Sequence, residues 1–527
     1  MSNAPGSSYD EVPYVDTCHA STHPDRLATL AAVHGLPAPP LESCRVLELG
    51  CARGGNLLPM ALELPAASFV GVDLSTRQVA EARESADALG LRNVTFHAMG
   101  LEEIGAAFGT FDYVVCHGVY SWVPEPVRAR ILDICATNLS PDGLAYVSYN
   151  TYPGWSSRGM VRDLVRFHAR EAETPEARVE RARGFLEELA GHVARQEGAY
   201  ASVLKVEASR FREADDTYLL HEFFEDDNAP CFVHEFLRRA EAAGLEFLAE
   251  AQAPGLFDGL PEAARGLVAR WADDVAAREQ YLDLMVNRTF RRTVLRRAGG
   301  SRAATRSPEA VERLAARAVV VPAPAAREAE GKDGPIEFVH PGRSGSIRTN
   351  DPALKAALLA LHGARPEALP FEMLWERVCE GLSRSGHSWP RPAEETRAAL
   401  RSSLLRLFLA DFVELHVSPP RPAAVPAERP VGSPLARHQA ANGRLVTSLL
   451  RKRVELGELD RSVLLELDGT RTEADVLDAV VVRVCSGELE LSDKSGPVRE
   501  AVAARALLAG EIRPAFERLA SLALLAG

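Results

Sequence analysis

The sequence contains few aromatic residues and no paired cysteines. Phe, Trp and Tyr together make up only 6% of the 527 residues. None of the eight cysteines belongs to a Cys-x-x-Cys pair. A structural zinc site or a disulfide framework is therefore not expected. Isolated cysteines usually behave as small buried apolar residues, and we expect most of these to do the same.

The chain also has no net positive charge and no long apolar stretch. The net charge is −13, which argues against a nucleic-acid partner, because affinity for nucleic acid depends on positive charge. The chain has no run of 18 apolar residues and no basic start followed by an apolar segment, so neither stable membrane association nor a secretion signal is expected. These features predict a cytoplasmic protein. A hydrophobic content of 46% allows large buried cores, and the length suggests about three domains.

Between residues 44 and 149, short apolar runs alternate with helical patterns. This alternation predicts a parallel α/β sheet with right-handed crossovers. The expected strands cover residues 44–49, 69–72, 94–98, 111–116 and 144–149, and the expected helices cover 56–64, 75–89 and 124–139. The pattern changes after Tyr149: residues 156–235 are mostly helical, and they are followed by a helix over 236–243, a strand over 245–250 and an antiparallel strand over 290–295.

The strongest motif is the segment VLELGCARGGN, residues 46–56. Gly50, Ala52 and Gly54 form a small-residue turn after a strand, which leaves room for a ligand to contact the backbone. The spacing differs from the G-x-G-x-x-G pattern of nicotinamide-binding proteins. Asp73 lies at the end of the second strand, where a carboxylate can accept both hydroxyls of a ribose. Together these residues predict a nucleoside-type cofactor; the alternative is a tight turn in another α/β fold.

At these residues the chain resembles class I S-adenosylmethionine-dependent methyltransferases. The resemblance implies a Rossmann-like sheet, S-adenosyl-L-methionine as cofactor, Glu48 as the residue that orders the loop at the methionine end, and Asp73 as the ribose ligand. The third strand of such enzymes usually ends in an acidic residue, but Gly100 occupies this position. Either backbone amides or Glu102 would then recognise adenine. The full set of predicted cofactor contacts is Glu48, Gly50, Ala52, Gly54, Asn56, Asp73, Leu74, Gly100, Leu101, His117 and Tyr14.

Several further segments resemble bacterial methyltransferases that carry a methyltransferase regulatory domain. These segments are FDYVVCHGVYSWVP (111–124), SYNTYPGW (148–155), YLLHE (218–222), NRTFR (287–291) and YDEVPY (9–14). The group includes rickettsial protein-lysine methyltransferases, so the resemblance implies a protein-lysine acceptor and a homodimer. The chain departs from the group at Asp16 and His19, where a hydroxyl and an aromatic residue are expected.

The sequence and the resemblance together predict six domains or segments. They are an N-terminal lid (1–40), a Rossmann-like core (41–155), a helical insertion over the acceptor site (156–235), the last strands of the core (236–300), a linker and middle domain (301–425) and a C-terminal helical domain (426–527).

Methyl transfer to lysine requires a neutral amine that faces the methyl carbon in line. Burial beside aromatic rings and a sulfonium favours the neutral amine. The candidate acceptor contacts follow the fourth and fifth strands, and they are Tyr149, Asn150, Tyr120, Trp122, Tyr152 and Trp155. For Trp122 and Trp155 the alternative is a role as core anchors. His117 either acts as a general base or lines the methionine pocket, and Tyr14 either closes over the cofactor or packs on the first helix.

Three functions are consistent with the sequence. They are methylation of a protein, methylation of a small-molecule acceptor from specialised metabolism, and a non-catalytic scaffold that binds the cofactor. The segment after the fourth strand lacks the Asn/Asp-Pro-Pro-aromatic pattern, which disfavours adenine-N6 and glutamine acceptors. His221, Glu222, Glu225 and His234 have metal-ligand chemistry, but the segment reads as a helix end and the reaction needs no metal, so no metal site is predicted.

Overall fold

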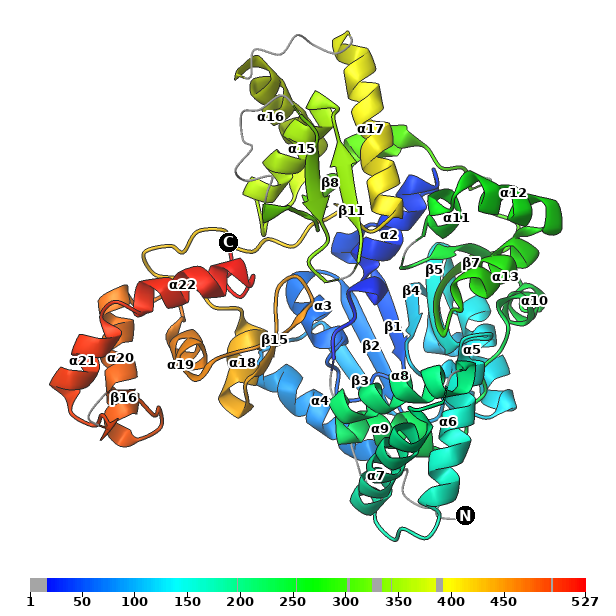
Figure 1. Cartoon of the computed structure of the whole chain (residues 1–527). Helices are drawn as coiled ribbons and strands as arrows, with labels where there is room; N and C mark the ends of the chain where they lie inside the picture. The colour runs from blue at the N-terminus through cyan, green and yellow to red at the C-terminus, as the bar shows by residue number, and fades with distance from the viewer. Residues whose placement is uncertain are drawn as a thin grey trace.

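The computed structural model describes residues 17–196, 198–252, 254–300, 304–324, 334–342, 344–384, 392–493 and 496–527. Tyr14 and the other predicted lid residues before Thr17 lie outside the described residues. Figure 1 shows a central sheet, a middle region above it that contains α15, α16 and α17, and a C-terminal region beside α3 and α4.

The central sheet has seven strands in the order β3-β2-β1-β4-β5-β7-β6. Strand β7 runs antiparallel to both of its neighbours, β5 and β6, and the other strand pairs of this sheet are parallel. The predicted fold class, an α/β protein with a Rossmann-like sheet, is confirmed. The chain leaves β1 for β2 on one side and returns to β4 on the other, and ligands bind at such a reversal. The strands are β1 Arg45–Leu49, β2 Ser68–Asp73, β3 Val94–Ala98, β4 Phe111–Cys116, β5 Leu139–Asn150, β6 Leu245–Glu250 and β7 Phe290–Arg297.

The helices between these strands begin and end close to the predicted residues. They are α3 Leu57–Glu63, α4 Thr76–Ala88 and α5 Glu125–Thr137. Ser75 caps α4, because its side chain accepts a hydrogen bond from the backbone N–H of Gln78 at 3.1 Å. Strand β5 begins at Leu139 rather than at Leu144. A register shift between Phe111 and Tyr113 lets Leu139 pair with β4, so the Pro-Asp-Gly sequence lies within the strand.

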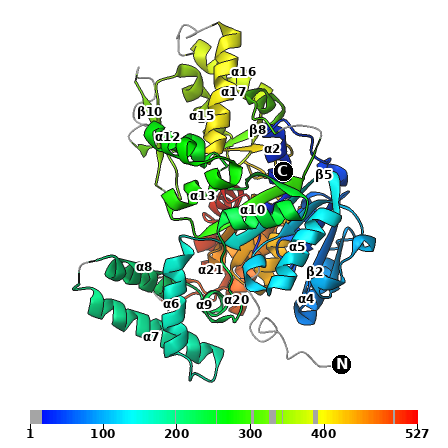
Figure 2. The ribbon, with the colours of Figure 1, turned by 90° about the vertical axis from the view of Figure 1, so that its right-hand side faces the viewer.

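Four helices follow β5 and form a separate group with its own core. They are α6 Trp155–His168, α7 Pro175–Val193, α8 Ala199–Glu213 and α9 Asp216–Phe224. Figure 2 shows this group projecting from the rest of the molecule. The core of the group includes Val165, Leu186, Leu204, Phe211 and Phe223. Helix α10 Val233–Ala242 then leads into β6, and α11 Leu256–Gly259, α12 Glu262–Trp271 and α13 Val275–Val286 precede β7.

The middle region packs on the sheet through α2 (Pro24–Val33), and the two share one hydrophobic core. Its strands are β8 Ala315–Ala318, β9 Val321–Pro322, β10 Ile336–Val339, β11 Ser346–Thr349, β12 Leu369–Pro370 and β13 Val413–His416, and its helices are α15 Pro352–Gly363, α16 Phe371–Arg384 and α17 Ala393–Leu409. Because β9 pairs with β10, the first two residues of the Pro-rich segment after residue 320 belong to a sheet.

The C-terminal region is mostly helical and contains two short hairpins in addition to its helices. Its elements are α18 Pro434–Asn442, β14 Leu445–Thr447, β15 Arg453–Glu455, α19 Glu458–Glu466, α20 Glu473–Ser486, β16 Ser492–Asp493, β17 Gly496–Pro497, α21 Ala501–Leu508 and α22 Ile512–Ser521. None of the helices in the described ranges is both long and apolar enough to cross a membrane.

Candidate cofactor and acceptor site

The bend after β1 contains three alternate residues in the left-handed backbone conformation. Gly50, Ala52 and Gly54 have φ angles of +76°, +46° and +79°. A Cβ atom at Gly50 would lie 2.3 Å from Cγ2 of Val119, and one at Gly54 would lie 2.8 Å from Cζ of Phe96. Glycine is therefore required at both positions, by backbone conformation as well as by space. The bend lies at the edge of the sheet where a ligand is expected.

Asp73 holds this bend in place at the carboxyl end of β2. Its Oδ2 accepts a hydrogen bond from the backbone N–H of Ala52 at 2.8 Å, and its Oδ1 accepts one from Ser75 at 3.0 Å. The adjacent Leu74 is 70% exposed. A carboxylate has about four acceptor positions, so one carboxylate is able to serve both backbone amides and ribose hydroxyls. A large apolar side chain exposed beside them gives a flat base a surface to pack on, and the residues present fit a nucleoside.

The end of β3 carries carboxylates even though Gly100 has no side chain. A Cβ atom at Gly100 would lie 2.6 Å from Oε2 of Glu102. Glu103 also folds back, and its Oε1 accepts a hydrogen bond from the N–H of Gly100 at 2.8 Å. The Glu102 carboxylate thus occupies the space that an acidic side chain at position 100 would use. Of the two alternatives for adenine recognition, this geometry favours Glu102, with Leu101 beside it in a short 3-10 helix.

The methionine end is closed by the segment that precedes α2. The buried Glu48 accepts a hydrogen bond from Nδ2 of Asn56 at 2.8 Å. Oδ1 of Asn56 in turn accepts one from the backbone N–H of His19 at 2.9 Å, and the Asn56 amide also bonds Thr22. The sequence predicted Glu48 and Asn56 but not their contact with residues 19–22. The departure at His19 was the available signal.

Two neutral imidazoles lie next to this network. Nδ1 of His117 is 2.9 Å from the hydroxyl of Tyr146, and the rings of His117 and His19 have centroids 3.7 Å apart. Burial, with a smaller contribution from Arg292, lowers the pKa of His19 to about 4, and burial also lowers the pKa of His117 well below its ordinary value. Such a His117 is a weak base at neutral pH, so the geometry favours its role as a wall of the methionine pocket.

The candidate acceptor residues that follow β4 and β5 fall into two groups. Asn150 is 2% exposed, its backbone N–H donates to Oγ of Ser121 at 2.8 Å, and within the described ranges its Nδ2 has no hydrogen-bond partner. Trp122 and Trp155 meet edge to face with centroids 6.3 Å apart. Tyr152 lies 5.3 Å from the ring of Phe232. These side chains combine an apolar surface with one buried amide that still needs a partner.

Tyr149 and Tyr120 both pack against α10, and their role as acceptor contacts stays a prediction. Tyr149 is 1% exposed, stacks on Phe236 of α10 at 4.1 Å, and places its hydroxyl 3.2 Å from Oγ1 of Thr293. Tyr120 packs edge to face on the same Phe236. Side chains alternate between the two faces of a strand, so Tyr149 points away from the face that carries Tyr146. Both tyrosine rings thus contact the same phenylalanine of α10.

The residues with metal-ligand chemistry make other contacts. Nδ1 of His221 is 2.8 Å from Glu225, and Nδ1 of His234 is 2.8 Å from Oε1 of Gln280. In the part of the chain that the structure describes, no group of three His, Cys, Asp or Glu side chains is placed to hold a metal ion.

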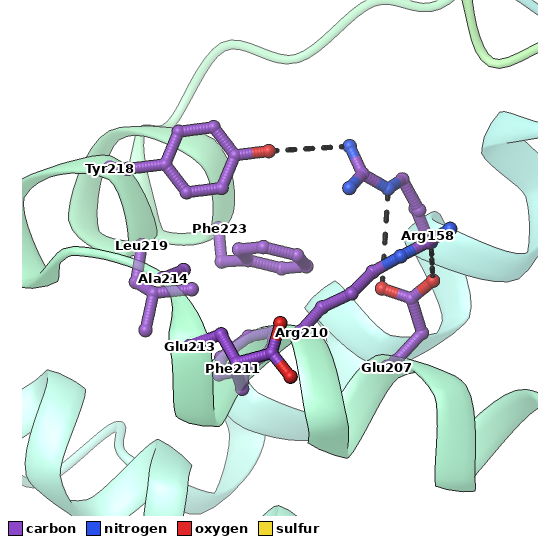
Figure 3. Close-up of a pocket in the computed structure, with 9 residues that line it drawn as sticks. All are labelled: Arg158, Glu207, Arg210, Phe211, Glu213, Ala214, Tyr218, Leu219 and Phe223. Carbon is purple, nitrogen blue, oxygen red and sulfur yellow. Dashed lines mark hydrogen bonds and ion pairs between the residues drawn. The ribbon is translucent and has the colours of Figure 1, made fainter. Parts of the chain in front are cut away.

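A cavity of about 260 Å³ lies within the group of helices α6 to α9. Figure 3 shows Arg158 in this cavity, reaching towards Tyr218 on one side and Glu207 on the other. Its lining comes from α6, α8, α9 and the connection between the last two, and includes no residue of the bend after β1. It is therefore separate from the nucleoside site.

Three segments of the chain match known protein families. Residues 46–143 match a family described as methyltransferase domain, residues 215–297 match one described as predicted methyltransferase regulatory domain, and residues 428–524 match one described as PKMT, C-terminal winged helix domain. The chain is also 31% identical to the uncharacterized protein RP789 of Rickettsia prowazekii over 524 residues, which cover 98% of this chain and 93% of RP789. The chain belongs to the S-adenosylmethionine-dependent methyltransferases that carry a methyltransferase regulatory domain.

Solved structures extend this similarity to the whole methyltransferase. PKMT2 from Rickettsia typhi matches it with a TM-score of 0.86 and 26% sequence identity, over 98% of this chain and 100% of PKMT2. PKMT2 has also been solved in complex with AdoHcy. A shorter relative, the aklanonic acid methyltransferase DauC of Streptomyces sp. strain C5, is 31% identical over 179 residues, 32% of this chain and 80% of DauC. The methyltransferase is thus an enzyme that uses S-adenosylmethionine.

Glu102 offers a direct test of how this methyltransferase recognises adenine. Replacing Glu102 with glutamine removes the charge and half of the acceptor capacity that would meet the exocyclic amine. We expect Glu102→Gln to weaken S-adenosylhomocysteine binding about tenfold, the effect of one charge-assisted hydrogen bond. The wild type should also prefer S-adenosylhomocysteine over S-inosylhomocysteine, which lacks the amine, and the variant should lose this preference. Calorimetric titration with both ligands measures these changes.

Glu103→Gln is the matched control, because Glu103 already accepts a bond from Gly100. It should leave the preference between the two ligands intact. If Glu102→Gln still discriminates between the two ligands as the wild type does, adenine is recognised by backbone amides rather than by Glu102.

Proposed function

We propose that the enzyme transfers the methyl group of S-adenosylmethionine to the ε-amine of lysine in a protein substrate. The observation that carries the proposal is the likeness to PKMT2, a name that denotes a protein-lysine methyltransferase, over the whole chain rather than over the nucleotide-binding sheet alone. The matched PKMT winged helix domain at residues 428–524 lies outside the matched methyltransferase domain at residues 46–143.

The side chains around the acceptor position suit a lysine that must become neutral. Lowering the pKa of an amine from about 10.4 to about 7.4 costs about 4 kcal/mol. Trp122 and Trp155 provide an apolar surface, which disfavours the charged ammonium. His19 and His117 are neutral at physiological pH because burial lowers the pKa of each, so they add no positive charge beside the site.

The bound cofactor supplies a methyl group on a positively charged sulfur. The chain itself contributes orientation: Glu48 and Asn56 fix the bend at the methionine end, and the buried amide of Asn150 gives the acceptor a polar group to contact. Correct alignment of two reactants accounts for a large part of the rate increase in such transfers.

A small-molecule acceptor is the second candidate, and the similarity to DauC supports it. The two candidates differ in where the transferred methyl group ends up. A homodimer and a cytoplasmic location are implied by the sequence and its resemblance, and both stay predictions.

We expect radiolabelled methyl groups from S-adenosylmethionine to appear in protein bands when the enzyme is incubated with a bacterial lysate. Acetylating the lysines of the same lysate beforehand should remove at least about nine-tenths of the label, because an acetylated amine has no available lone pair. Acid hydrolysis of the labelled bands should release methylated lysine. Enzyme carrying Asp73→Ala serves as the blank.

Label confined to the small-molecule fraction would contradict protein methylation and favour the second candidate. Label in protein bands that survives acetylation would contradict lysine as the acceptor.

A further inference from the structure

The hairpin between β14 and β15 reaches from the C-terminal region to the cofactor domain. Its Arg451 donates from Nε and Nη2 to the two carboxylate oxygens of Glu63, at 3.1 and 2.5 Å. Nη1 of the same side chain lies 4.0 Å from Oδ2 of Asp25. Arg451 is 7% exposed and Asp25 is 1% exposed, so these charges depend on one another rather than on water. In Figure 1 the hairpin at β15 lies beside α3.

The backbone of Arg451 is held in an unfavourable conformation. Its φ angle of +58° is in the left-handed region, which residues with a Cβ atom rarely adopt. The tight turn is closed by hydrogen bonds from the N–H of Arg451 to Ser448 at 2.8 Å and from Ser448 to Lys452 at 2.9 Å. Such strain persists where surrounding contacts require it. Here it directs the guanidinium towards Glu63 in the two-point geometry that arginine and carboxylate favour.

The two partners of Arg451 belong to the elements that build the methionine end of the site. Glu63 is the last residue of α3, and Asn56 precedes the first residue of the same short helix. Asp25 lies in the first turn of α2, directly after the segment that contains His19 and Thr22. The two elements also meet at the amino end of α3, because Asn56 bonds both His19 and Thr22 while it donates to Glu48.

Asp25 is also fixed by the end of the middle region. Its Oδ2 is 2.7 Å from Nδ1 of His416, and its Oδ1 accepts a hydrogen bond from the N–H of Ser418 at 2.8 Å. Burial disfavours the charged form of Asp25, but His416 and Arg451 more than offset this, so its pKa lies below the ordinary value. Asp25 therefore presents a negative charge to Arg451.

We propose that Arg451 is a positioning residue for the methyl donor. By binding Glu63 and Asp25 at once, the C-terminal region holds α3 and α2 in the relative placement that brings residues 19–22 onto Asn56 and Asn56 onto Glu48. Cofactor affinity then depends on a side chain that belongs to a different domain from the cofactor bend. The inference concerns the donor site and is independent of which acceptor the enzyme uses.

The test compares full-length Arg451→Met with Arg518→Met. Arg518 pairs with Asp460 at 2.7 Å inside the C-terminal region and makes no contact with α2 or α3 in any bond that the structure shows for it. We expect Arg451→Met to weaken S-adenosylhomocysteine binding about tenfold in calorimetric titration and to raise the KM for S-adenosylmethionine similarly, with kcat at saturation within about twofold of wild type. Hydrogen exchange should increase at residues 17–23 and at Asn56. Arg518→Met should change none of these.

Arg451→Lys keeps the charge but not the two-point geometry, so it should recover part of the affinity. Unchanged affinity in a folded Arg451→Met variant would overturn the proposal, and so would an equal loss of affinity in Arg518→Met. If Arg451→Met does not fold, Glu63→Gln carries the same test from the other side of the ion pair. An unchanged affinity in Glu63→Gln then overturns the proposal, and a loss near tenfold supports it.

Discussion

Replacing Asp73 with alanine is expected to weaken binding of S-adenosylmethionine and S-adenosylhomocysteine about 100-fold and to abolish methyl transfer at ordinary cofactor concentrations. Hydrogen bonds to a charged acceptor contribute about 1.5–3 kcal/mol each, and the ribose offers two hydroxyls. Alanine also removes the acceptor for the N–H of Ala52, which anchors the bend. Asp73→Asn keeps one acceptor oxygen and should lose less, about tenfold. Calorimetry with S-adenosylhomocysteine measures both variants.

Asp112→Ala is a suitable control for this experiment. Asp112 also accepts a hydrogen bond from a backbone N–H, that of Arg45 at 2.9 Å, but it does so near the amino end of β4 at the opposite edge of the sheet. It should lower thermal stability without changing cofactor affinity. A folded Asp73→Ala variant that binds S-adenosylhomocysteine within threefold of wild type would contradict the placement of the ribose.

Gly50→Ala should impair both folding stability and cofactor binding. Alanine at φ +76° costs about 1 kcal/mol in backbone energy, and its Cβ atom would approach Cγ2 of Val119 to 2.3 Å. Relieving that contact moves Val119 or the bend, at a further cost of about 1–3 kcal/mol. We therefore expect a lower melting temperature and at least a tenfold loss of affinity for S-adenosylhomocysteine, measured by thermal unfolding and calorimetry.

Gly90→Ala separates the two contributions. Gly90 has a similar φ of +69°, but a Cβ atom there would meet nothing within 4 Å. Gly90→Ala should lower the free energy of unfolding only by the cost of the backbone conformation, and it should leave cofactor affinity unchanged. Equal effects of Gly50→Ala and Gly90→Ala on affinity would show that the space above Gly50 is unimportant for the ligand.

The local pattern of the sequence predicted the nucleoside-binding half of the fold well. Strands β3 and β4 occupy the predicted residues 94–98 and 111–116, because each is a short apolar run flanked by turn residues. The antiparallel strand after residue 290 was also predicted. These features follow from residues that lie close together in the sequence. The motif that contains Gly50 and Gly54, with Asp73 after it, could be identified in the same way.

Contacts between distant segments could not be predicted in the same way. Nothing near Tyr149 in the sequence indicates that its ring stacks on Phe236, since that depends on which face α10 covers. The approach of His19 to His117 depends on the path of the chain before α2. Glu102 was recognised as an alternative to Gly100, but only the fold of its short helix shows its carboxylate turning back towards that glycine.

Helix α2 links the catalytic sheet to the middle region. Its Leu27 and Leu30 are fully buried in the core that the sheet and the middle region share, and Thr29 accepts a hydrogen bond from the N–H of Val417 at 3.1 Å. A fragment that ended soon after β7 would expose that apolar face to water and strip Asp25 of its positively charged neighbours. We therefore expect the catalytic sheet and the middle region to unfold together as one cooperative unit.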